Sequence, residues 1–373
     1  MGGDEFAIVQ SGLTHPQEAA ALAKRVVQSI NTPFDIDGHE VIVGTSIGIA
    51  VCPIDGEQGE ELIRNADLAL YRSKAEGRCT YRFFEPGMDG QMKIRRSLET
   101  DLRKAITVGE FELHYQPVAD LQSNTITGCE ALLRWRHPQK GMILPDAFIP
   151  LAEEIGAIMP LGEWVIREAC RTAAGWPDTV KVSVNLSPVQ FHGADLCRVV
   201  VSALAASGLA PQRLELEVTE NVLLIHSKKV VTTFNRLRDL GVRIALDDFG
   251  AGHSSLSYLR QFPFDNIKID RSFVQDITES PSSQCIVHAI AEMAQGLSMI
   301  TTAEGVETAE QKAAVLSAGC SEMQGYLLSR AVPADEIAQL LRRGAAMAAD
   351  ETADASGEGD PASSGLKAVT RSR

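Results

Sequence analysis

Eight strand-like segments alternate with helical ones between residues 111 and 328, and this alternation constrains the fold more than any other feature of the chain. The helical stretches are amphipathic and separate most of the strands; they are Gly162–Ala173, Lys228–Leu240, Ser283–Gly296 and Ala309–Ala318. The expected strands are short and largely apolar; they are Phe111–Val118, Thr125–Trp135, Val180–Ser187, Leu214–Glu220, Val242–Asp248, Asn266–Asp270, Met299–Glu304 and Met323–Leu328. This pattern predicts an α/β fold in the form of a (β/α)8 barrel of the TIM type.

The first two expected strands are too close together in the sequence for a helix to connect them. Only the residues from Ala119 to Asn124 separate them, whereas a crossover between parallel strands needs roughly a dozen residues or more. We therefore expect this pair to be antiparallel, so that the barrel contains one antiparallel strand.

Two adjacent carboxylates, Asp247 and Asp248, follow the apolar run of the fifth expected strand and precede a glycine-rich turn. Two unpaired carboxylates at about 4 Å repel each other by roughly 4 kcal/mol at an effective dielectric constant near 20. A fold that keeps them side by side needs a cation there. An isolated Asp-Asp pair is also compatible with a solvated turn, so the interpretation depends on what the other strands carry.

Polar residues also occur on the inward face of several other expected strands. Strand alternation puts Leu214 and Leu216 under the helices and turns Glu215 and Glu217 into the barrel. The same argument applies to five further residues, which are Glu130, Asn185, Lys268, Asp270 and Glu304. Barrel enzymes build their active sites at the carboxyl ends of the strands. Each residue alone has a structural alternative, since Lys268 could neutralise Asp270 and Glu217 could cap a helix.

The predicted cluster contains carboxylates and one amide carbonyl, without cysteine or an inward histidine. Hard oxygen ligands favour Mg²⁺ or Mn²⁺ over zinc, with Ca²⁺ as an inhibitory substitute. There are enough carboxylates for two ions bridged by one aspartate at the ~3.5–4 Å spacing of two-metal hydrolases. Such a pair activates a water and stabilises charge on a phosphoryl oxygen, which suits a phosphodiester substrate.

The composition excludes several classes of protein. The formal net charge of −14 argues against non-specific nucleic-acid binding and leaves no basic patch for a membrane surface. The most apolar candidate for a membrane span, Val199–Leu209, is too short. Seven scattered cysteines without a CxxC pair fit reduced thiols, and the acidic N-terminus lacks a signal-peptide pattern. These features indicate a cytoplasmic protein.

Residues 1–88 show a shorter alternation of strand and helix, with an expected strand at Ala7–Val9 and expected helices at Gln17–Ile30 and Glu60–Ala75. A charged helical stretch at residues 89–110 is the expected linker helix into the barrel. After Arg343 the chain consists mainly of Ala, Asp, Glu, Ser and Gly, so residues 344–373 are expected to be a disordered tail.

Motifs at the N-terminus resemble a known family. Gly2-Gly-Asp-Glu-Phe6, Arg64-Asn-Ala-Asp67 and Leu70-Tyr-Arg-Ser-Lys74 are similar to the C-terminal half of a GGDEF (diguanylate cyclase) domain. The resemblance implies a partial α+β GGDEF segment over residues 1–88, with Asp4 or Glu5 as a metal-binding acid. The half that should precede it is absent, so we expect a regulatory or dimerising segment, or a truncated gene model, rather than an active cyclase.

A second set of motifs, in residues 93–343, resembles an EAL domain. In chain order these motifs are Gln116-Pro117, Glu130-Ala-Leu132, Leu133-Arg134-Trp135, Val184-Asn-Leu-Ser187, Glu217-Val-Thr-Glu220, Asp247-Asp-Phe-Gly250, Ile267-Lys-Ile-Asp270, Ala303-Glu-Gly-Val-Glu307 and Gln324-Gly-Tyr326. The resemblance implies an Mg²⁺- or Mn²⁺-dependent phosphodiesterase that hydrolyses cyclic di-GMP to linear pGpG, and a homodimer formed through this domain.

The resemblance also implies roles for individual residues. The implied metal ligands are Glu130, Asn185, Glu217, Asp247 and Asp248, with Asp247 bridging two ions. The implied catalytic residues are Lys268, which orients the nucleophilic water, and Glu304, Glu130 and Asp247. The implied substrate-binding residues are Arg134, which contacts a phosphate, and Gln116, Gln324 and Asp270. Glu220 is expected to steady the loop after the Asp pair, and Glu307 to support the site residues without contacting the metal ions itself.

One residue departs from the family pattern, because His253 replaces the tyrosine of the loop after the Asp pair. It is either a tolerated flat ring or a source of pH-dependent coupling between metal and substrate. Two other functions compete with catalysis. The barrel could be a non-catalytic cyclic di-GMP receptor that signals through partners, or the chain could be a scaffold that acts through its N-terminal segment.

Overall fold

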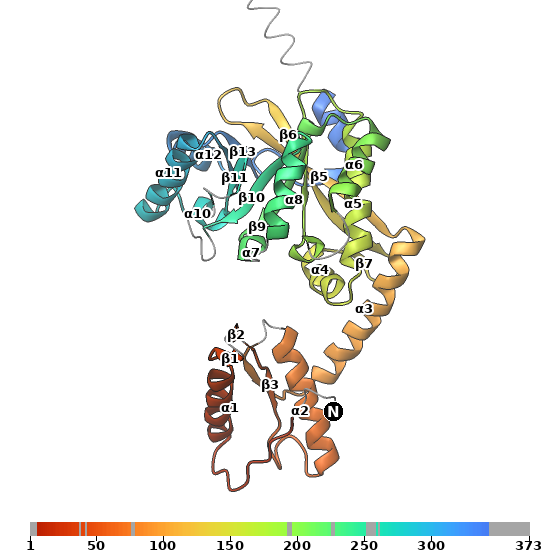
Figure 1. Cartoon of the computed structure of the whole chain (residues 1–373), viewed down its shortest axis with the longest axis vertical. Coiled ribbons are helices and arrows are strands. Elements are labelled where there is room, and N and C mark those ends of the chain that lie inside the picture. Colours follow the sequence, from red (N-terminus) through yellow and green to blue (C-terminus); the bar gives the residue numbers. More distant parts are fainter. Residues whose placement is uncertain are drawn as a thin grey trace, which may run out of the picture. The chain divides into compact units, whose positions relative to one another are not determined.

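The computed structural model describes residues 6–36, 39–41, 43–75, 79–191, 196–224, 228–250, 259 and 262–342. The chain divides into two compact units, Met1–Asp101 and Leu102–Arg373, and the boundary falls inside helix α3 (Met88–Val108) (Figure 1). The expected tail, the acids of the GGDEF turn and His253 all lie outside the described residues.

The N-terminal unit is built on a strand–helix–strand motif. Strand β3 (Ile47–Ile49) pairs in parallel with β4 (Tyr81–Phe83), and helix α2 (Gly59–Ala75) connects them. Any Cβ at Gly48 would lie 2.0 Å from the carbonyl oxygen of Ala66 in α2, so only glycine permits this close approach.

The rest of the N-terminal unit consists of a helix and a hairpin. They are α1 (Pro16–Ile30) and the antiparallel strands β1 (Phe34–Ile36) and β2 (His39–Val41). The strand expected at Ala7–Val9 does not form: these residues have no strand partner and Val9 is 94% exposed. An apolar run predicts a strand only where a neighbouring strand can accept its backbone hydrogen bonds.

Eight strands of the C-terminal unit form a closed barrel, in the spatial order β5-β13-β12-β11-β10-β9-β8-β6 and back to β5. They are β5 (Phe111–Asp120), β6 (Ile126–His137), β8 (Lys181–Asn185), β9 (Leu214–Thr219), β10 (Arg243–Phe249), β11 (Asn266–Ile269), β12 (Ile300–Glu304) and β13 (Glu322–Gln324). Short strand β7 (Gly141–Ile143) pairs antiparallel with β6, and short strand β14 (Val332–Pro333) pairs antiparallel with β5. The predicted barrel is confirmed.

The predicted antiparallel strand is β5, which runs antiparallel to both of its neighbours, β6 and β13. The carboxylate of Asp120 accepts hydrogen bonds from the backbone N–H groups of Gln122 and Ser123, at 3.1 and 2.7 Å, and so forms the tight turn into β6. This turn replaces a crossover helix and reverses the chain direction.

Helices cover the outside of the barrel (Figure 1). They are α4 (Pro145–Glu154), α5 (Ile158–Ala173), α6 (Leu196–Ser207), α7 (Glu220–Leu224), α8 (Lys228–Asp239), α10 (Arg271–Gln275), α11 (Pro281–Gly296) and α12 (Ala309–Ser317). Local signals set several boundaries: Thr308 and Gln311 form a capping box at the start of α12, and Ser280 caps α11 just before Pro281. In the part of the chain that is described, no helix is long and apolar enough to cross a membrane.

The strands alternate as the sequence predicts. On β9, Leu214 and Leu216 are 0% and 1% exposed and belong to the apolar core, whereas Glu215 and Glu217 contact residues of other strands across the barrel. The last strand is shorter than expected, because the chain turns after Gln324. A Cβ on Gly325 would lie 2.0 Å from the carbonyl oxygen of Val306, so the turn needs glycine there.

Candidate active site

A buried lysine at the carboxyl ends of the parallel strands is surrounded by four carboxylates. Lys268 on β11 is 2% exposed. Its Nζ lies 2.8 Å from Glu217 Oε2, 2.8 Å from Glu304 Oε1, 3.2 Å from Asp247 Oδ1 and 3.4 Å from Glu130 Oε2. The carboxylates come from β9, β12, β10 and β6. The alternative that Lys268 merely neutralises Asp270 does not describe this arrangement.

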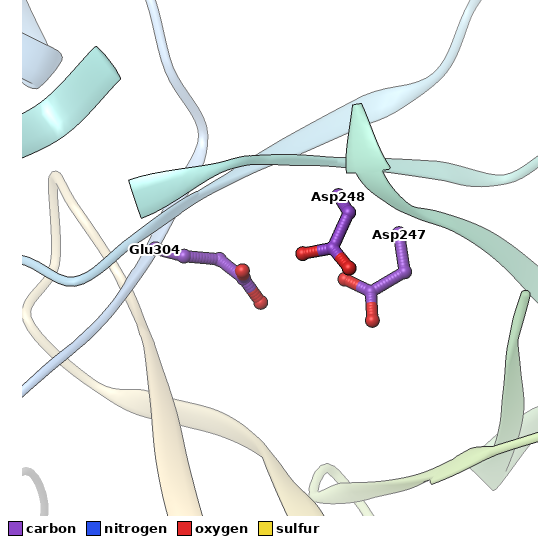
Figure 2. Close-up of side chains that lie close together, drawn as sticks. All are labelled: Asp247, Asp248 and Glu304. Carbon is purple, nitrogen blue, oxygen red and sulfur yellow. The ribbon is translucent and has the colours of Figure 1, made fainter. Parts of the chain in front are cut away.

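Asp248 joins these residues through an irregularity in strand β10. Consecutive strand residues normally point to opposite faces. Here the pairing of β10 with β11 shifts register between Leu246 and Phe249, and Asp248 has a φ of +54°. One carboxylate oxygen from each of Asp247, Asp248 and Glu304 thereby lies within 4.8 Å of the other two. Figure 2 shows these three side chains close together. We call the resulting set the mouth cluster; it comprises Glu130, Glu217, Asp247, Asp248, Lys268 and Glu304.

Amide side chains hold Glu130 on both sides. Asn185 Nδ2 donates to Glu130 Oε1 and Gln324 Nε2 donates to Glu130 Oε2, each at 2.6 Å. Gln324 Nε2 also donates to Gln116 Oε1 at 3.3 Å, and Gln116 Nε2 donates to the carbonyl oxygen of Ser329 at 3.2 Å. Gln116 and Glu130 are direct partners in the β5–β6 ladder, so the strand register brings these side chains together.

The mouth cluster holds more negative charge than its lysine can balance. Its five carboxylates and one ammonium have a formal charge of −4 when all are ionised. Burial raises the pKa of Glu304 to about 8, against the opposing charge of Lys268. Burial also raises the pKa of Glu217 well above its usual range, and burial together with neighbouring carboxylates raises the pKa of Asp248. In the metal-free protein, bound protons on these carboxyl groups therefore reduce the negative charge that Lys268 alone does not balance.

Lys268 and Glu130 keep their charges. Burial disfavours the ammonium, but the surrounding carboxylates outweigh it and hold the pKa of Lys268 well above its usual value. Burial likewise disfavours the Glu130 carboxylate, but Lys268 and the two amides hold its pKa below the usual value.

The oxygen atoms of the mouth cluster and its neighbours are suited to bind divalent cations. Two buried acceptors, Asp247 Oδ1 and Gln324 Oε1, receive no hydrogen bond from any residue that the structure describes. Asp247 Oδ1 faces Lys268 Nζ as an ion pair without hydrogen-bond alignment. A buried acceptor without a donor costs about 1–3 kcal/mol, so a cation or a water bound next to either atom would stabilise it. All available ligand atoms are oxygen, the element that Mg²⁺, Mn²⁺ and Ca²⁺ prefer.

Cationic side chains accompany the acidic mouth. Arg134 lies four residues after Glu130 on β6 and donates from Nη1 to the carbonyl oxygen of Leu133 at 2.9 Å. Burial lowers the pKa of Arg134, against the opposing charge of Glu130. Sequence reasoning did not single out Arg330, whose guanidinium lies 4.0 Å from the centre of the Tyr326 ring; Tyr326 in turn interacts electrostatically with Arg134. The only signal of Arg330 was an arginine four residues after an aromatic residue in a turn.

Two of the remaining predicted site residues, Asp270 and Glu220, interact with the Asp pair or the backbone next to it, and Glu307 has no such contact among the described residues. Asp270 is the N-cap of α10 and accepts a hydrogen bond from the N–H of Ser272 at 3.0 Å, while its charge contributes to the raised pKa of Asp248. Glu220 Oε1 accepts from the N–H of Gly250 at 3.3 Å, just after the Asp pair. Glu307 is exposed, and its backbone N–H donates to Gln311 Oε1 at 2.8 Å.

Comparison with known protein families gives two matches. Residues 99–331 match the EAL domain, and residues 1–80 match the diguanylate cyclase GGDEF domain. Both matches agree with the families that the sequence motifs resemble.

Curated relatives and solved structures are similar over most of the chain. The cyclic di-GMP phosphodiesterase NbdA of Pseudomonas aeruginosa is 42% identical over 91% of this chain and 44% of its own length. The bifunctional diguanylate cyclase/cyclic di-GMP phosphodiesterase MucR of the same organism is 41% identical over 90% of this chain and 50% of its own length. The chain thus spans about half the length of these relatives. The structure of the PaMucR phosphodiesterase in complex with c-di-GMP is 40% identical, covers 65% of this chain and 99% of its own, and has a TM-score of 0.62.

Proposed function

The chain belongs to the EAL-domain family, and from this premise we propose that it hydrolyses cyclic di-GMP to linear pGpG with the aid of two divalent cations. The observation that carries the proposal is the convergence of five carboxylates on one buried lysine at the barrel mouth. The names of the relatives NbdA and MucR supply the substrate.

Two ions account for the charge of the mouth cluster, because two divalent cations neutralise a formal charge of −4. Glu130, Glu217 and Asp247 would hold one ion, and Asp247 and Asp248 would hold a second, with Glu304 beside them. Asn185 would join the first set if its amide turned to present the carbonyl oxygen. Mg²⁺ or Mn²⁺ serves this role and Ca²⁺ competes with it. Such ions supply an activated water and stabilise charge on the phosphoryl oxygens.

The protein's own side chains position the reactants. Once cations balance the carboxylates, Lys268 can donate a hydrogen bond to the attacking water and orient it. Arg134 contacts a phosphate of the dinucleotide, and Gln116 and Gln324 present amide groups to the substrate or to water. Asp270 lies close enough to influence Asp248, and Glu220 fixes the backbone at Gly250.

The test is turnover of cyclic di-GMP by the full chain with Mg²⁺ or Mn²⁺, followed by separation of pGpG. We expect turnover by the wild type and none by Glu130→Ala. Glu163→Ala is a matched control, because Glu163 is paired with Arg167 on the surface of α5, outside the barrel mouth. Binding of cyclic di-GMP without formation of pGpG would replace the enzyme with the receptor alternative.

The proposal extends to the organisation of the protein. Residues 93–343 form the catalytic unit, and residues 1–88 regulate it or dimerise, acting through the linker helix at residues 89–110. The catalytic unit forms a homodimer. The protein acts in the cytoplasm, which is supported by seven cysteines that form no disulfide among the described residues. Measurement of the molar mass in solution, with and without residues 1–88, tests the dimer and the part of the chain that forms it.

A further inference from the structure

A second polar layer lies inside the barrel beneath the mouth cluster. Three residues of the mouth cluster, and Gln324 which donates to Glu130, have a polar residue two positions earlier on the same strand, and therefore on the same inward face. These pairs are Glu215 under Glu217, Asn266 under Lys268, Thr302 under Glu304 and Glu322 under Gln324. All four lower residues are buried. Barrel interiors are usually filled with branched apolar side chains, so a polar layer at this depth needs an explanation.

This layer is joined across the barrel by ion pairs and hydrogen bonds. Lys181 Nζ lies 3.4 Å from Glu322 Oε1 and 3.9 Å from Glu215 Oε2. Arg243 Nε lies 3.3 Å from Glu215 Oε2. Asn266 Nδ2 donates to Glu215 Oε1 at 3.3 Å.

Hydroxyl groups also donate hydrogen bonds to both carboxylate oxygens of Glu322. Thr127 Oγ1 donates to Glu322 Oε1 at 2.7 Å, and Thr302 Oγ1 donates to Glu322 Oε2 at 3.2 Å. We call this set the floor layer; it comprises Thr127, Lys181, Glu215, Arg243, Asn266, Thr302 and Glu322.

The floor layer is electrically balanced, and the mouth cluster is not. Two cations, Lys181 and Arg243, face two carboxylates, Glu215 and Glu322. A cavity of about 10 Å³ lies between the layers, and residues of both line it, including Lys181, Glu217 and Lys268. A space of this size holds at most one water. The Lys181 ammonium and Glu217, a carboxylate proposed to hold an ion, therefore line the same cavity.

We propose that the floor layer keeps a competing cation, the Lys181 ammonium, away from the mouth cluster. Glu322 is a positioning residue: its ion pair with Lys181 holds the ammonium in the floor layer and so preserves the affinity of the mouth cluster for divalent ions. Without the Glu322 charge, the ammonium of Lys181 keeps only Glu215, which Arg243 already shares. The surplus positive charge then acts through the cavity on Glu217. In a barrel interior of low dielectric constant such a charge opposes the binding of a cation. The inference rests on the proposed metal site.

The experiment is a titration of the full-length, metal-free chain with Mn²⁺ by calorimetry, with bound Mn²⁺ counted by electron paramagnetic resonance. We expect Glu322→Gln to weaken Mn²⁺ binding roughly tenfold, because glutamine keeps the shape and removes the charge. We expect Lys181→Met in the same chain to restore the affinity. A purely structural role predicts the reverse, since the double variant has lost more contacts than the single one. Glu163→Gln, the same change on a surface ion pair, should leave binding unchanged.

The outcomes separate this inference from the proposed function. A wild type that binds no Mn²⁺ overturns the metal site itself. A wild type that binds Mn²⁺, together with an unaffected Glu322→Gln variant or a double variant that stays weak, overturns only the role of the floor layer. If Glu322→Gln does not fold, Lys181→Met alone decides the question. Removal of the cation should then strengthen Mn²⁺ binding, and unchanged or weaker binding contradicts the proposal.

Discussion

The mouth cluster and the floor layer lie on the same strands and use the same kinds of side chain, but they differ in completeness. Every carboxylate of the floor layer is matched by a cation or by neutral donors within the protein. The mouth cluster has surplus negative charge, raised carboxyl pKa values and a buried acceptor, Asp247 Oδ1, that receives no hydrogen bond from the described residues. The comparison teaches that an incomplete polar layer marks a ligand site, whereas a complete one supports it. The presence of buried polar residues does not by itself distinguish a ligand site from a supporting layer.

The largest expected effect comes from removing the one cation of the mouth cluster. Lys268→Met should lower kcat by roughly 10²–10⁴-fold, because the attacking water loses its orienting group. The same change should strengthen Mn²⁺ binding, since the ammonium no longer competes for the four carboxylates. Single-turnover assays and calorimetry measure the two effects. Loss of both activity and metal affinity would contradict the assigned role and make Lys268 a structural residue.

The pH dependence of stability should distinguish metal-free from metal-loaded protein. Glu304, with a pKa of about 8, and Glu217 keep protons in the folded state that the unfolded chain releases above its carboxyl pKa near 4.5. The folded state therefore binds more protons, and its stability falls as the pH rises from about 4.5 through about 8, by an amount on the order of a few kcal/mol. Bound Mn²⁺ replaces those protons and should remove the decline.

Denaturant unfolding at pH 5.5, 7 and 8.5, with and without Mn²⁺, measures this difference. The Asp247→Asn variant serves as the comparison, because it should bind Mn²⁺ weakly and gain little protection from it. If the free energy of unfolding of the wild type fell equally with pH in the presence and absence of Mn²⁺, protons would not occupy the place of metal ions.

Within the floor layer, an uncharged change should affect stability alone. Thr302→Val removes the hydroxyl that joins Asn266 to Glu322 and should cost about 1–3 kcal/mol in the free energy of unfolding. Because the charge balance is unchanged, Mn²⁺ affinity should stay at the wild-type value. A Thr302→Val variant that folds normally but binds Mn²⁺ weakly would mean that hydrogen bonding, rather than charge, links the layers.

The smallest expected effect concerns Asp270, at the edge of the mouth cluster. Asp270→Asn keeps a side chain that caps α10 well, so stability should change by less than about 0.5 kcal/mol. It removes a negative charge that raises the pKa of Asp248, so that pKa should fall. An altered KM for cyclic di-GMP would support the substrate-binding role predicted for Asp270, and unchanged kinetics would limit Asp270 to capping.

Periodicity predicted most of the barrel and the inward residues, because a period of two identifies a face without knowledge of the neighbouring strands. Glu215 and Glu217 on β9 are the clearest case. The direction of Asp248 could not be predicted this way, since it depends on a register shift against β11 that no single strand reveals. Glu322 was missed because the last strand was expected to begin one residue later, and its partner Lys181 is 141 positions away in sequence. The prediction of a strand at Ala7–Val9 was wrong because hydrophobicity does not specify a pairing partner.

The reversed direction of β5 decides at which end the chain reaches the barrel. In a fully parallel barrel the first strand starts at the end opposite to the active site, but Phe111 at the start of β5 pairs with Trp135, beyond Glu130 on the mouth side. The junction after α3 is fastened there, where Glu110 Oε2 accepts a hydrogen bond from Trp135 Nε1 at 3.0 Å, next to Arg134. A displacement of the C-terminal end of α3 would therefore act on the barrel at Trp135, beside Arg134, which we propose to contact a phosphate; the chain enters the barrel on the side of the proposed substrate site.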